Sequence, residues 1–510
     1  MSKPAYDLEN KIYVIQPEGN AITAPLAGVN QSLRKAISII GLVVTDSLSL
    51  ILALWVAVQI RLYVLPAIFP VFPERLPPQL FEKLWWALAI TIMCLAYERL
   101  YTRRLSFWRE TKRLLAVISL AYILMLAFVS LAKLGGEVSR TVLVVGYFIS
   151  LFVMPLGRYI GKTLLGLMGV WKEPVVIIGT GNIAQAVADA LIKDSYLGYK
   201  VVGFLQNNKD EDHDSIQVNK NKIPILGNFE DAAKVLSQQK IRHIIIASPE
   251  LPGKELVSLT NQLQRSTRSM VVVPDLSGIP VVSGEADYFF EEQIIAFHTR
   301  NNLASRINII TKRLFDIVVG VLLLIPLIPL LLLIALIIKI DSQGPAIYSG
   351  NRIGRHGIEF KCYKFRTMFL NNDEILEQYF KDHPEALEEW QKYAKLKGDD
   401  PRVTRVGKYL RKLSLDELPQ IINVIKGEMS LVGARPYLPR EKEDMGEYAD
   451  TILMANPGIT GLWQVSGRNE IDFQGRVQLE TWYVRNWSLW LDITLLFRTI
   501  GVVLGRKGAY

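Results

Sequence analysis

The chain has 510 residues, half of them apolar, with a net charge of +9 and a mean hydropathy of +0.22, and this length predicts two or three structural units rather than one core. Anionic lipid headgroups or phosphate-bearing substrates account for so mild a positive charge, so nucleic-acid binding is not expected. The two cysteines, Cys94 and Cys362, are far apart and the histidines form no HExxH motif, which argues against a disulfide framework and a transition-metal site.

The first predicted part is a polar segment, residues 1–35, which lacks the apolar core of a cleavable signal peptide. A transmembrane domain is predicted over residues 36–171, because four apolar stretches there are long enough, or nearly so, to cross roughly 30 Å of hydrocarbon as helices. The four stretches are 36–60, 84–98, 114–132 and 141–160. The second is the weakest, because it is short and charged residues flank it on both sides.

Basic residues are concentrated in alternate flanks of these stretches. The flanks before the first span, between the second and third, and after the fourth contain Lys3, Lys11, Arg34, Lys35, Arg99, Arg103, Arg104, Arg109, Lys112, Arg113, Lys162 and Lys172. The other two loops contain fewer: Arg61, Arg75, Lys83, Lys133 and Arg140. By the positive-inside rule, the N-terminus and everything after residue 170 face the cytoplasm.

Asp46 lies inside the first predicted span, where an unpaired charge is costly. One interpretation is a proton or ligand site. The other, which we favour, is a buried contact with a partner side chain within the helical bundle.

Residues 172–304 change to short β-branched runs that alternate with amphipathic segments, which predicts a parallel, doubly wound, Rossmann-like sheet. The runs are 174–181, 200–205, 224–226, 243–248 and 270–276. Gly179 and Gly181 belong to a GTGNIA turn that suits a phosphate on backbone N–H groups. However, Gln206 and Asn207 follow the second strand where a dinucleotide site usually has an acidic residue. A nucleotide site and a regulatory or structural module both stay open, and we favour the latter.

Residues 315–338 would count as a fifth crossing by hydropathy alone, which would place residues 340–510 outside the cell. Pro326 and Pro329 stand in the middle of this run, where each removes a backbone donor and clashes with the preceding turn. A break at that depth lets a helix enter, bend and leave on the same side. A proline-kinked spanning helix is the alternative, because neighbouring helices can satisfy the freed carbonyl groups.

The rest of the chain is dense in glycine, arginine and paired acidic residues, most clearly in 344–368, 399–436 and 456–469. Ser414-x-x-Glu417 has the spacing of a capping box, and acidic residues near a helix start suit the helix dipole. Capping alone does not explain two adjacent carboxylates, Asp416 and Glu417, which repel each other unless a cation neutralises them.

A magnesium ion commonly bridges one or two carboxylates to a substrate phosphate. Donors that phosphate oxygens require occur in the same blocks: Lys364, Arg366, Arg402, Arg405, Arg411 and Arg435. Together these residue types indicate phosphoryl transfer, in which a carboxylate can act as nucleophile by forming an acyl phosphate.

The blocks resemble those of the bacterial polyprenyl-phosphate sugar-1-phosphate transferases, in particular the large members that start O-antigen and capsule repeat units. KRLFD, GPxxY, KFRTM, DPRxT, LRKLSLDELPQ, GEMSLVGARP and PGITGLWQVSGR occur in the family's order from about residue 305 to the end. Four spans followed by a Rossmann-like module is also the layout of the long members. The resemblance implies a mainly α monotopic catalytic domain over 305–510, with a re-entrant helix at about 314–339.

The resemblance also implies a ping-pong reaction between a UDP-sugar and undecaprenyl phosphate, with galactose as the expected sugar and glucose as the alternative. Asp416 would attack the sugar-bearing phosphorus and release UMP, and Glu417 would hold Mg2+. The side chains expected to bind phosphate or support the site are Lys364, Arg366, Arg402, Arg411 and Arg435. Lys312 and Arg313 would anchor the re-entrant helix at the interface, around the bend at Pro326 and Pro329.

The expected location is the bacterial inner membrane, with the N-terminus, the Rossmann-like module and the catalytic domain in the cytoplasm. The expected partners are the UDP-sugar, undecaprenyl phosphate, membrane lipid and a second copy of the chain. The C-terminal stretch, with Trp482, Trp487 and Trp490, predicts either an interfacial helix or a core-packing helix. The rival function is a membrane-anchored, nucleotide-sensing binding protein, and a transporter is weaker because the spans are few.

Overall fold

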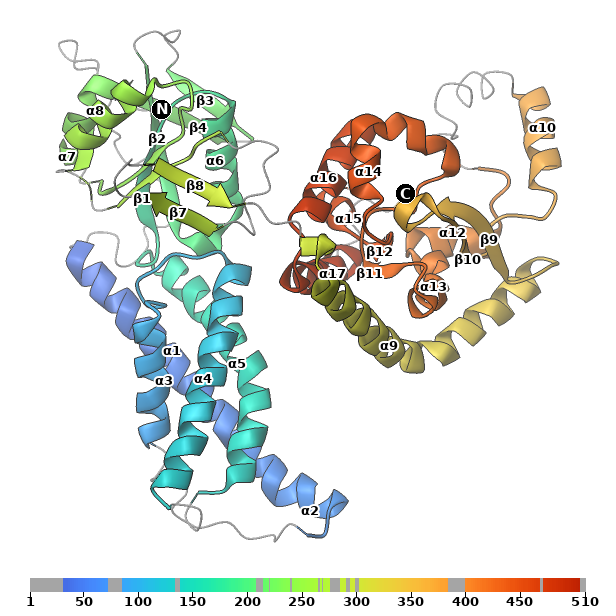
Figure 1. The fold of residues 1–510 in the computed structure, drawn as a ribbon, viewed down its shortest axis with the longest axis horizontal. Helices are drawn as coiled ribbons and strands as arrows, with labels where there is room; N and C mark the ends of the chain where they lie inside the picture. The colour runs from blue at the N-terminus through green and yellow to red at the C-terminus, as the bar shows by residue number, and fades with distance from the viewer. Residues whose placement is uncertain are drawn as a thin grey trace, which may run out of the picture. The chain divides into compact units, whose positions relative to one another are not determined.

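The computed structural model describes residues 31–71, 85–133, 138–207, 214–219, 221–238, 241–264, 267, 269–275, 285–289, 294–298, 302–383, 400–467 and 471–504. It divides the chain into two compact units, 1–275 and 276–510 (Figure 1). The first combines the predicted helical bundle with most of the predicted sheet module, and the second contains the predicted catalytic region. Most of the polar N-terminal segment, the last residue of the 270–276 run, Leu276, and the basic C-terminal Arg506 and Lys507 lie outside the described residues.

The bundle of the first unit is built from long apolar helices. They are α1 (Gln31–Gln59), which continues through the π-helical η1 (Ile60–Val64) into α2 (Leu65–Ile68), α3 (Trp85–Tyr97), α4 (Phe107–Leu131) and α5 (Arg140–Leu167). The stretch from α1 to α2, α4 and α5 are long and apolar enough to cross a membrane. With 13 residues, the described helix α3 is about 20 Å long, so it falls short of the predicted span.

A buried charge network joins three helices of the bundle. Arg158 on α5 makes a two-pronged ion pair with Asp46 on α1, with nitrogen–oxygen distances of 2.7 and 2.9 Å. It also lies 2.7 Å from Glu110 on α4, which in turn pairs with Lys162 at 2.5 Å. The favoured interpretation of Asp46 as a buried partner contact is therefore confirmed.

The sheet of the first unit has the order β3-β4-β2-β1-β5-β6, and every neighbouring pair is parallel except β3 with β4. The strands are β1 (Glu173–Ile178), β2 (Tyr199–Gln206), β3 (Ser215–Val218), β4 (Asn221–Asn228), β5 (His243–Ile246) and β6 (Ser269–Val272). Helices α6 (Asn182–Lys193), α7 (Ala232–Gln238) and α8 (Gly253–Gln264) complete the module. All five predicted runs form strands, whereas β3 was not predicted, because its SIQV sequence is short and half polar.

The second unit begins with the hairpin β7 (Glu285–Phe289) and β8 (Ile294–His298), the turn η6 (Asn302–Ala304), and the long helix α9 (Arg306–Asp341). A second antiparallel hairpin follows, formed by β9 (Ile347–Ile353), η7 (Arg355–Gly357) and β10 (Glu359–Phe365). The remaining elements are α10 (Asn372–Asp382), α12 (Arg405–Lys412), η8 (Leu415–Glu417), α13 (Gln420–Lys426), β11 (Ser430–Val432), η9 (Pro439–Tyr448), α14 (Ala449–Ile452), β12 (Gly458–Thr460), α15 (Leu462–Ser466), α16 (Phe473–Arg485) and α17 (Leu489–Leu504).

Helix α9 is the most exposed apolar element of the described chain that is long enough to cross a membrane. Figure 1 shows that it bends between its two ends, and Pro326 and Pro329 lie inside it. Only 11% of its most apolar window is buried, although this window has a mean hydropathy of 3.3. An apolar surface of this size is not stable in water, so this helix is the part of the second unit that suits lipid.

The two basic residues before the apolar run make contacts within their own unit. Lys312 is 7% exposed, and its ammonium group donates to Asp492 Oδ2 at 2.6 Å and to the Val432 carbonyl at 2.9 Å. Arg313 donates to the carbonyl groups of Val424 and Ile425, at the end of α13. Both residues therefore fasten α9 to the core of its own unit, and their expected interfacial role stays a prediction.

The C-terminal helix α17 packs into the same core along one face. Trp487, just before it, is 2% exposed and donates its indole N–H to Asp492 Oδ2 at 3.0 Å, and Leu495 is also buried. Phe497 and Ile500 on α17 are more than half exposed. The core-packing interpretation is thus confirmed for one face of α17, whereas Phe497 and Ile500 form an exposed apolar surface on this helix.

Candidate active site

The two adjacent carboxylates lie on a tight turn between α12 and α13. Thr404 caps α12 by accepting the Gly407 N–H at 2.9 Å. After α12, Ser414 adopts a left-handed conformation with φ of 55°, so the chain turns into η8, which contains Asp416 and Glu417. The Ser414 side chain makes no cap hydrogen bond, so the predicted capping box does not form. A capping residue has an extended backbone, which Ser414 lacks.

Strand β10 brings Lys364 to this turn. Its ammonium group lies 2.6 Å from Glu417 Oε1, and both side chains are about one third exposed. The strand is held against α13 by Asn423, which is fully buried, accepts the Tyr363 N–H at 3.0 Å and donates to the Lys361 carbonyl at 2.7 Å. The sequence analysis did not predict this role of Asn423. An asparagine in the middle of an apolar helical stretch is nevertheless a recognisable signal of a buried polar contact.

Asp416 is half-buried, and within the described residues its carboxylate makes no hydrogen bond or ion pair with another side chain. Burial raises the pKa of Asp416 above its usual value, Glu417 raises it further, and the charges of Lys364 and Arg411 partly offset this rise. The carboxylate is therefore partly desolvated and faces two cations without being bound by either. Such a carboxylate is available to a substrate. The Glu417 carboxylate is not, because it is paired with Lys364.

Arg411, on the last turn of α12, is the second cation near Asp416. Its Nε donates to Thr367 Oγ1 at 2.9 Å, which fixes the side chain beside the turn. Desolvation lowers the pKa of Arg411, and the negative charges of Asp416 and Asp400 act against this. An arginine stays charged under these conditions, and a charged guanidinium has the forked donor geometry that matches phosphate oxygens.

Two other predicted phosphate donors are already occupied by contacts within the protein. Arg402 makes a two-pronged ion pair with Asp400, with distances of 2.8 and 2.6 Å. Arg366 is 6% exposed and donates to the carbonyl groups of Gln343 and Ser342, at the C-terminal end of α9. The structure therefore gives both residues a structural contact, and direct phosphate binding by either would require that contact to break.

Arg435 lies in a different cluster from Asp416. Its backbone N–H donates to Glu480 Oε1 on α16 at 2.8 Å, and the same carboxylate accepts the hydroxyl of Tyr437. Burial raises the pKa of Glu480 to about 7, although these hydrogen bonds and the charges of Arg476 and Arg435 lower it. Among the described residues, no contact joins Arg435 to Asp416, Glu417 or Lys364.

The described residues contain no group of three or more His, Cys, Asp or Glu side chains that could hold a metal ion. Asp416 and Glu417 alone offer two carboxylates. That donor set fits Mg2+, which is usually held by one or two carboxylates together with substrate phosphates and water.

The predicted glycine turn belongs to the sheet module of the first unit. Gly179 has φ of 112°, and a Cβ there would lie 2.7 Å from the Ala247 carbonyl oxygen, so only glycine fits. Gly181 precedes α6, and a Cβ at Gly181 would lie 3.4 Å from Glu250 Oε1. The negative charge of Glu250 near the start of α6 would repel a phosphate group bound at this turn. Nucleotide binding at the turn therefore stays a prediction.

Comparisons with known proteins cover both units. The model of the family described as bacterial sugar transferase matches residues 307–506, and a model described as CoA-binding domain matches residues 96–274. The undecaprenyl-phosphate galactose phosphotransferase of Salmonella typhimurium is 36% identical over 92% of this chain and 97% of its own. The UDP-galactose-lipid carrier transferase of Erwinia amylovora is 38% identical over 82% and 87%, respectively.

A more distant relative is named for a different sugar. The UDP-glucose:undecaprenyl-phosphate glucose-1-phosphate transferase of Escherichia coli is 30% identical over 69% of this chain and 72% of its own. Since relatives of this similarity match along most of their length and the family model covers α9 to α17, the chain belongs to the bacterial sugar transferase family.

Proposed function

We propose that the protein transfers galactose-1-phosphate from UDP-galactose to undecaprenyl phosphate, releases UMP and leaves undecaprenyl-diphosphate-galactose. The names of the Salmonella and Erwinia relatives support galactose, and the lower identity of the glucose-named relative makes UDP-glucose the alternative donor. The observation that carries the proposal is the unoccupied Asp416 carboxylate between Lys364 and Arg411. This reaction would be the first membrane step of a surface polysaccharide.

The geometry favours a two-step displacement. In the first step an Asp416 oxygen attacks the phosphorus that bears the sugar, the bond from that phosphorus to the bridging oxygen breaks, and the bridging oxygen leaves with UMP. In the second step an oxygen of undecaprenyl phosphate attacks the same phosphorus and breaks the acyl-phosphate bond, which restores the Asp416 carboxylate. Covalent catalysis of this kind divides one difficult displacement into two easier ones.

The cations next to Asp416 provide the charge neutralisation that phosphoryl transfer needs. Arg411 would hold the non-bridging oxygens of the diphosphate, and Lys364 would exchange its contact with Glu417 for one with phosphate. Glu417, released in this way, would hold Mg2+, which supplies further neutralisation of the leaving phosphate when bound.

The location follows from α9 and from the bundle. We infer that α9 enters the cytoplasmic leaflet, bends around Pro326 and Pro329, and returns on the same side, which keeps Asp416 where a soluble donor meets a lipid acceptor. The cytoplasmic orientation of the N-terminus and of both soluble regions in the inner membrane rests on the distribution of basic residues. A homodimer is part of the same proposal.

The decisive experiment measures UMP release by the purified full-length chain from UDP-galactose and from UDP-glucose, with and without undecaprenyl phosphate. We expect Asp416→Asn to abolish release in both conditions and Glu417→Gln to reduce activity or the Mg2+ requirement. Asp373→Asn, the same change on the exposed first turn of α10, is the matched control. Normal turnover by Asp416→Asn would refute the covalent role, and faster turnover of UDP-glucose would reassign the sugar.

A further inference from the structure

The guanidinium group of Arg411 is bound to the protein on one side only. Its Nε donates to Thr367 Oγ1, and within the described residues its two terminal nitrogens make no hydrogen bond or ion pair. A guanidinium binds a phosphate group through two parallel N–H donors on one edge. The contact with Thr367 therefore leaves the edge formed by the two terminal nitrogens for a ligand.

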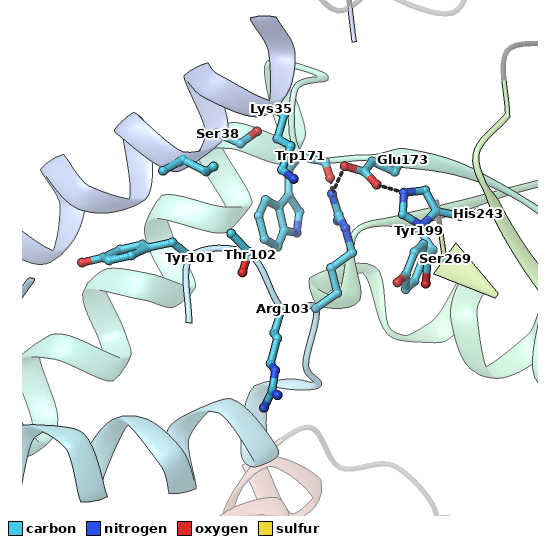
Figure 2. A pocket seen from close by; sticks show the side chains of 12 residues that line it. Lys35, Ser38, Tyr101, Thr102, Arg103, Trp171, Glu173, Tyr199, His243 and Ser269 are labelled. Carbon is cyan, nitrogen blue, oxygen red and sulfur yellow. Dashed lines mark hydrogen bonds and ion pairs between the residues drawn. The ribbon is translucent and has the colours of Figure 1, made fainter. Parts of the chain in front are cut away.

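Arg104 of the first unit is the contrasting case. One of its terminal nitrogens pairs with Glu173 at 3.0 Å, and the other donates to the carbonyl groups of Trp171 and Gly198, each at 2.8 Å. Figure 2 shows the contacts of Glu173 with this arginine and with His243, in the wall of a cavity of about 380 Å³. Both terminal nitrogens of Arg104 thus bind the protein itself, which is the pattern of an arginine with a structural role.

The packing of α12 brings Thr367 next to Arg411. Gly407 and Arg411 are four residues apart, so they lie on one face of this helix, and helical side chains point back toward the N-terminus. A Cβ at Gly407 would collide with the Thr367 carbonyl oxygen, so only glycine lets the two backbones come this close. The Arg411 side chain therefore runs along the face on which Thr367 packs, and it reaches the hydroxyl there.

The Thr367 hydroxyl is held in place by contacts that do not involve Arg411. Thr367 is 8% exposed, and its carbonyl accepts the Thr404 N–H at 3.0 Å, at the start of α12. The preceding residue, Arg366, donates its side chain to the carbonyl groups at the end of α9 and its backbone N–H to the Ala346 carbonyl. Thr367 is thus a fixed acceptor that is attached to both α9 and α12.

The same short segment, residues 364–367, sets both cations near Asp416. Lys364 contacts Glu417, and Arg411 is close enough to Asp416 for the negative charge of this residue to act on its pKa. Arg411 is exposed, so without the Thr367 contact its side chain would sample many rotamers. A hydrogen bond that selects one rotamer in advance reduces the entropy that is lost when the transition state forms.

We propose that Thr367 is a positioning residue for the transfer reaction, because its hydroxyl holds Arg411 Nε and so directs the two terminal nitrogens of Arg411 toward the diphosphate of the sugar donor. This role rests on the proposed function, in which Arg411 binds the diphosphate, and Thr367 itself does not touch the substrate. Catalysis of phosphoryl transfer depends mainly on positioning and charge neutralisation. Loss of this one acceptor therefore slows the reaction although no charge is removed.

The test measures transfer to undecaprenyl phosphate by the purified full-length chain, from UDP-galactose or UDP-glucose, whichever is turned over faster. Thr367→Val removes the hydroxyl and keeps the shape of the side chain. We expect it to lower kcat about tenfold and to change the KM for the donor less than about threefold, because the lost hydrogen bond acts mainly in the transition state. Thr367→Ser keeps the hydroxyl and should keep kcat within about twofold of the unsubstituted chain.

A double-substitution cycle shows whether Thr367 acts through Arg411. Arg411→Met alone should lower kcat at least as much as Thr367→Val, and adding Thr367→Val to it should change kcat less than about twofold. Thr494→Val is the matched control, because Thr494 is 7% exposed and its hydroxyl donates to the Trp490 carbonyl on α17. This control should leave kcat unchanged.

Melting temperatures in detergent identify any variant that does not fold, and Thr367→Ala, which also lacks the hydroxyl, then replaces Thr367→Val. A normal kcat without the hydroxyl, beside a reduced kcat in Arg411→Met, would overturn the positioning role and leave the proposed function intact. An effect of Thr367→Val that persists in the Arg411→Met background would overturn it too. Turnover of neither donor by the unsubstituted chain would refute the proposed function, and the role of Thr367 with it.

Discussion

The Lys364 ammonium group lies 2.6 Å from the Glu417 carboxylate, whereas the neighbouring Asp416 carboxylate is bound by no other described side chain. One lysine thereby gives the two adjacent acids different surroundings. Glu417 is neutralised and held, and Asp416 is left partly desolvated and open to substrate. This asymmetry is the structural reason why we propose Asp416 as the nucleophile.

Replacing Lys364 by glutamine should move the acid limb of the transfer activity to higher pH. Burial raises the pKa of Asp416 and Lys364 lowers it, so losing the lysine charge raises it further. In the proposed mechanism Asp416 attacks only when it is ionised, so activity should be lost as the pH falls through its pKa. The maximal rate should also fall roughly a hundredfold, because a phosphate donor is lost.

The measurement for Lys364→Gln is a pH–rate profile of UMP release. Lys426→Gln is the control, since Lys426 is exposed and contacts Tyr363 of the same hairpin instead of the acids. An acid limb that stays in place in Lys364→Gln would show that Lys364 does not act on the nucleophile.

Glu480→Gln should flatten the pH dependence of thermal stability. The folded-state pKa of Glu480, about 7, lies above its ordinary value of 4.5, so between these values the folded chain binds a proton that the unfolded chain does not. The free energy of unfolding is therefore greatest below the unfolded pKa of 4.5. It falls as the pH rises from there through the folded pKa of about 7. Glutamine can still accept the Arg435 N–H but does not titrate.

Thermal unfolding of both proteins in detergent, followed from about pH 5 to about pH 8, checks this prediction. The melting temperature of the unsubstituted chain should fall over this range more than that of Glu480→Gln. Parallel curves for the two proteins would mean that the Glu480 carboxylate is ionised in the fold throughout.

The sequence predicted the strands and the acidic turn because their signals are local. Short β-branched runs identified β1, β2, β4, β5 and β6, and the adjacent acids identified the turn of Asp416. The partners of long polar side chains could not be predicted, because they depend on which distant element packs alongside. Lys312, expected at an interface, contacts Asp492 on α17, which is 180 residues away in sequence.

Arg366 and Arg402 show the same limit within the candidate site. Their residue type and position suited phosphate, but one binds the end of α9 and the other binds Asp400. Ser414 had the spacing of a capping residue, yet its left-handed backbone places its side chain outside that role. Spacing in sequence predicts which residues share a helix or strand. Which hydrogen bonds their side chains make depends on the backbone conformation and on the elements that pack alongside.

Arg158→Met should destabilise the bundle by about 3–5 kcal/mol, since it leaves Asp46 and Glu110 buried without their shared partner. The expected readout is a lower unfolding temperature of the full chain in detergent. Arg109→Met on the exposed face of α4 is the control and should change little. Adding Asp46→Asn to Arg158→Met should recover part of the loss, and unchanged stability of Arg158→Met would contradict the network.

Cysteine labelling tests the re-entrant form of α9. In a background without Cys94 and Cys362, single cysteines at Val257 before α9 and at Leu370 after it should react with an impermeant maleimide only when the inner membrane is opened. Both side chains are more than half exposed. A cysteine at Val71, after α2, is the positive control and should react in intact cells whose outer membrane is permeable to the reagent. Labelling of Leu370→Cys in those intact cells would show that α9 crosses the membrane.

The most direct measurement is mass spectrometry of the chain after brief incubation with UDP-galactose and Mg2+ in the absence of undecaprenyl phosphate. The account predicts one hexosyl phosphate on the peptide that contains Asp416, one UMP released per modified chain, and loss of the adduct when undecaprenyl phosphate is added. UMP release that occurs only with the lipid acceptor, with an unmodified Asp416 peptide at every time point, would contradict it.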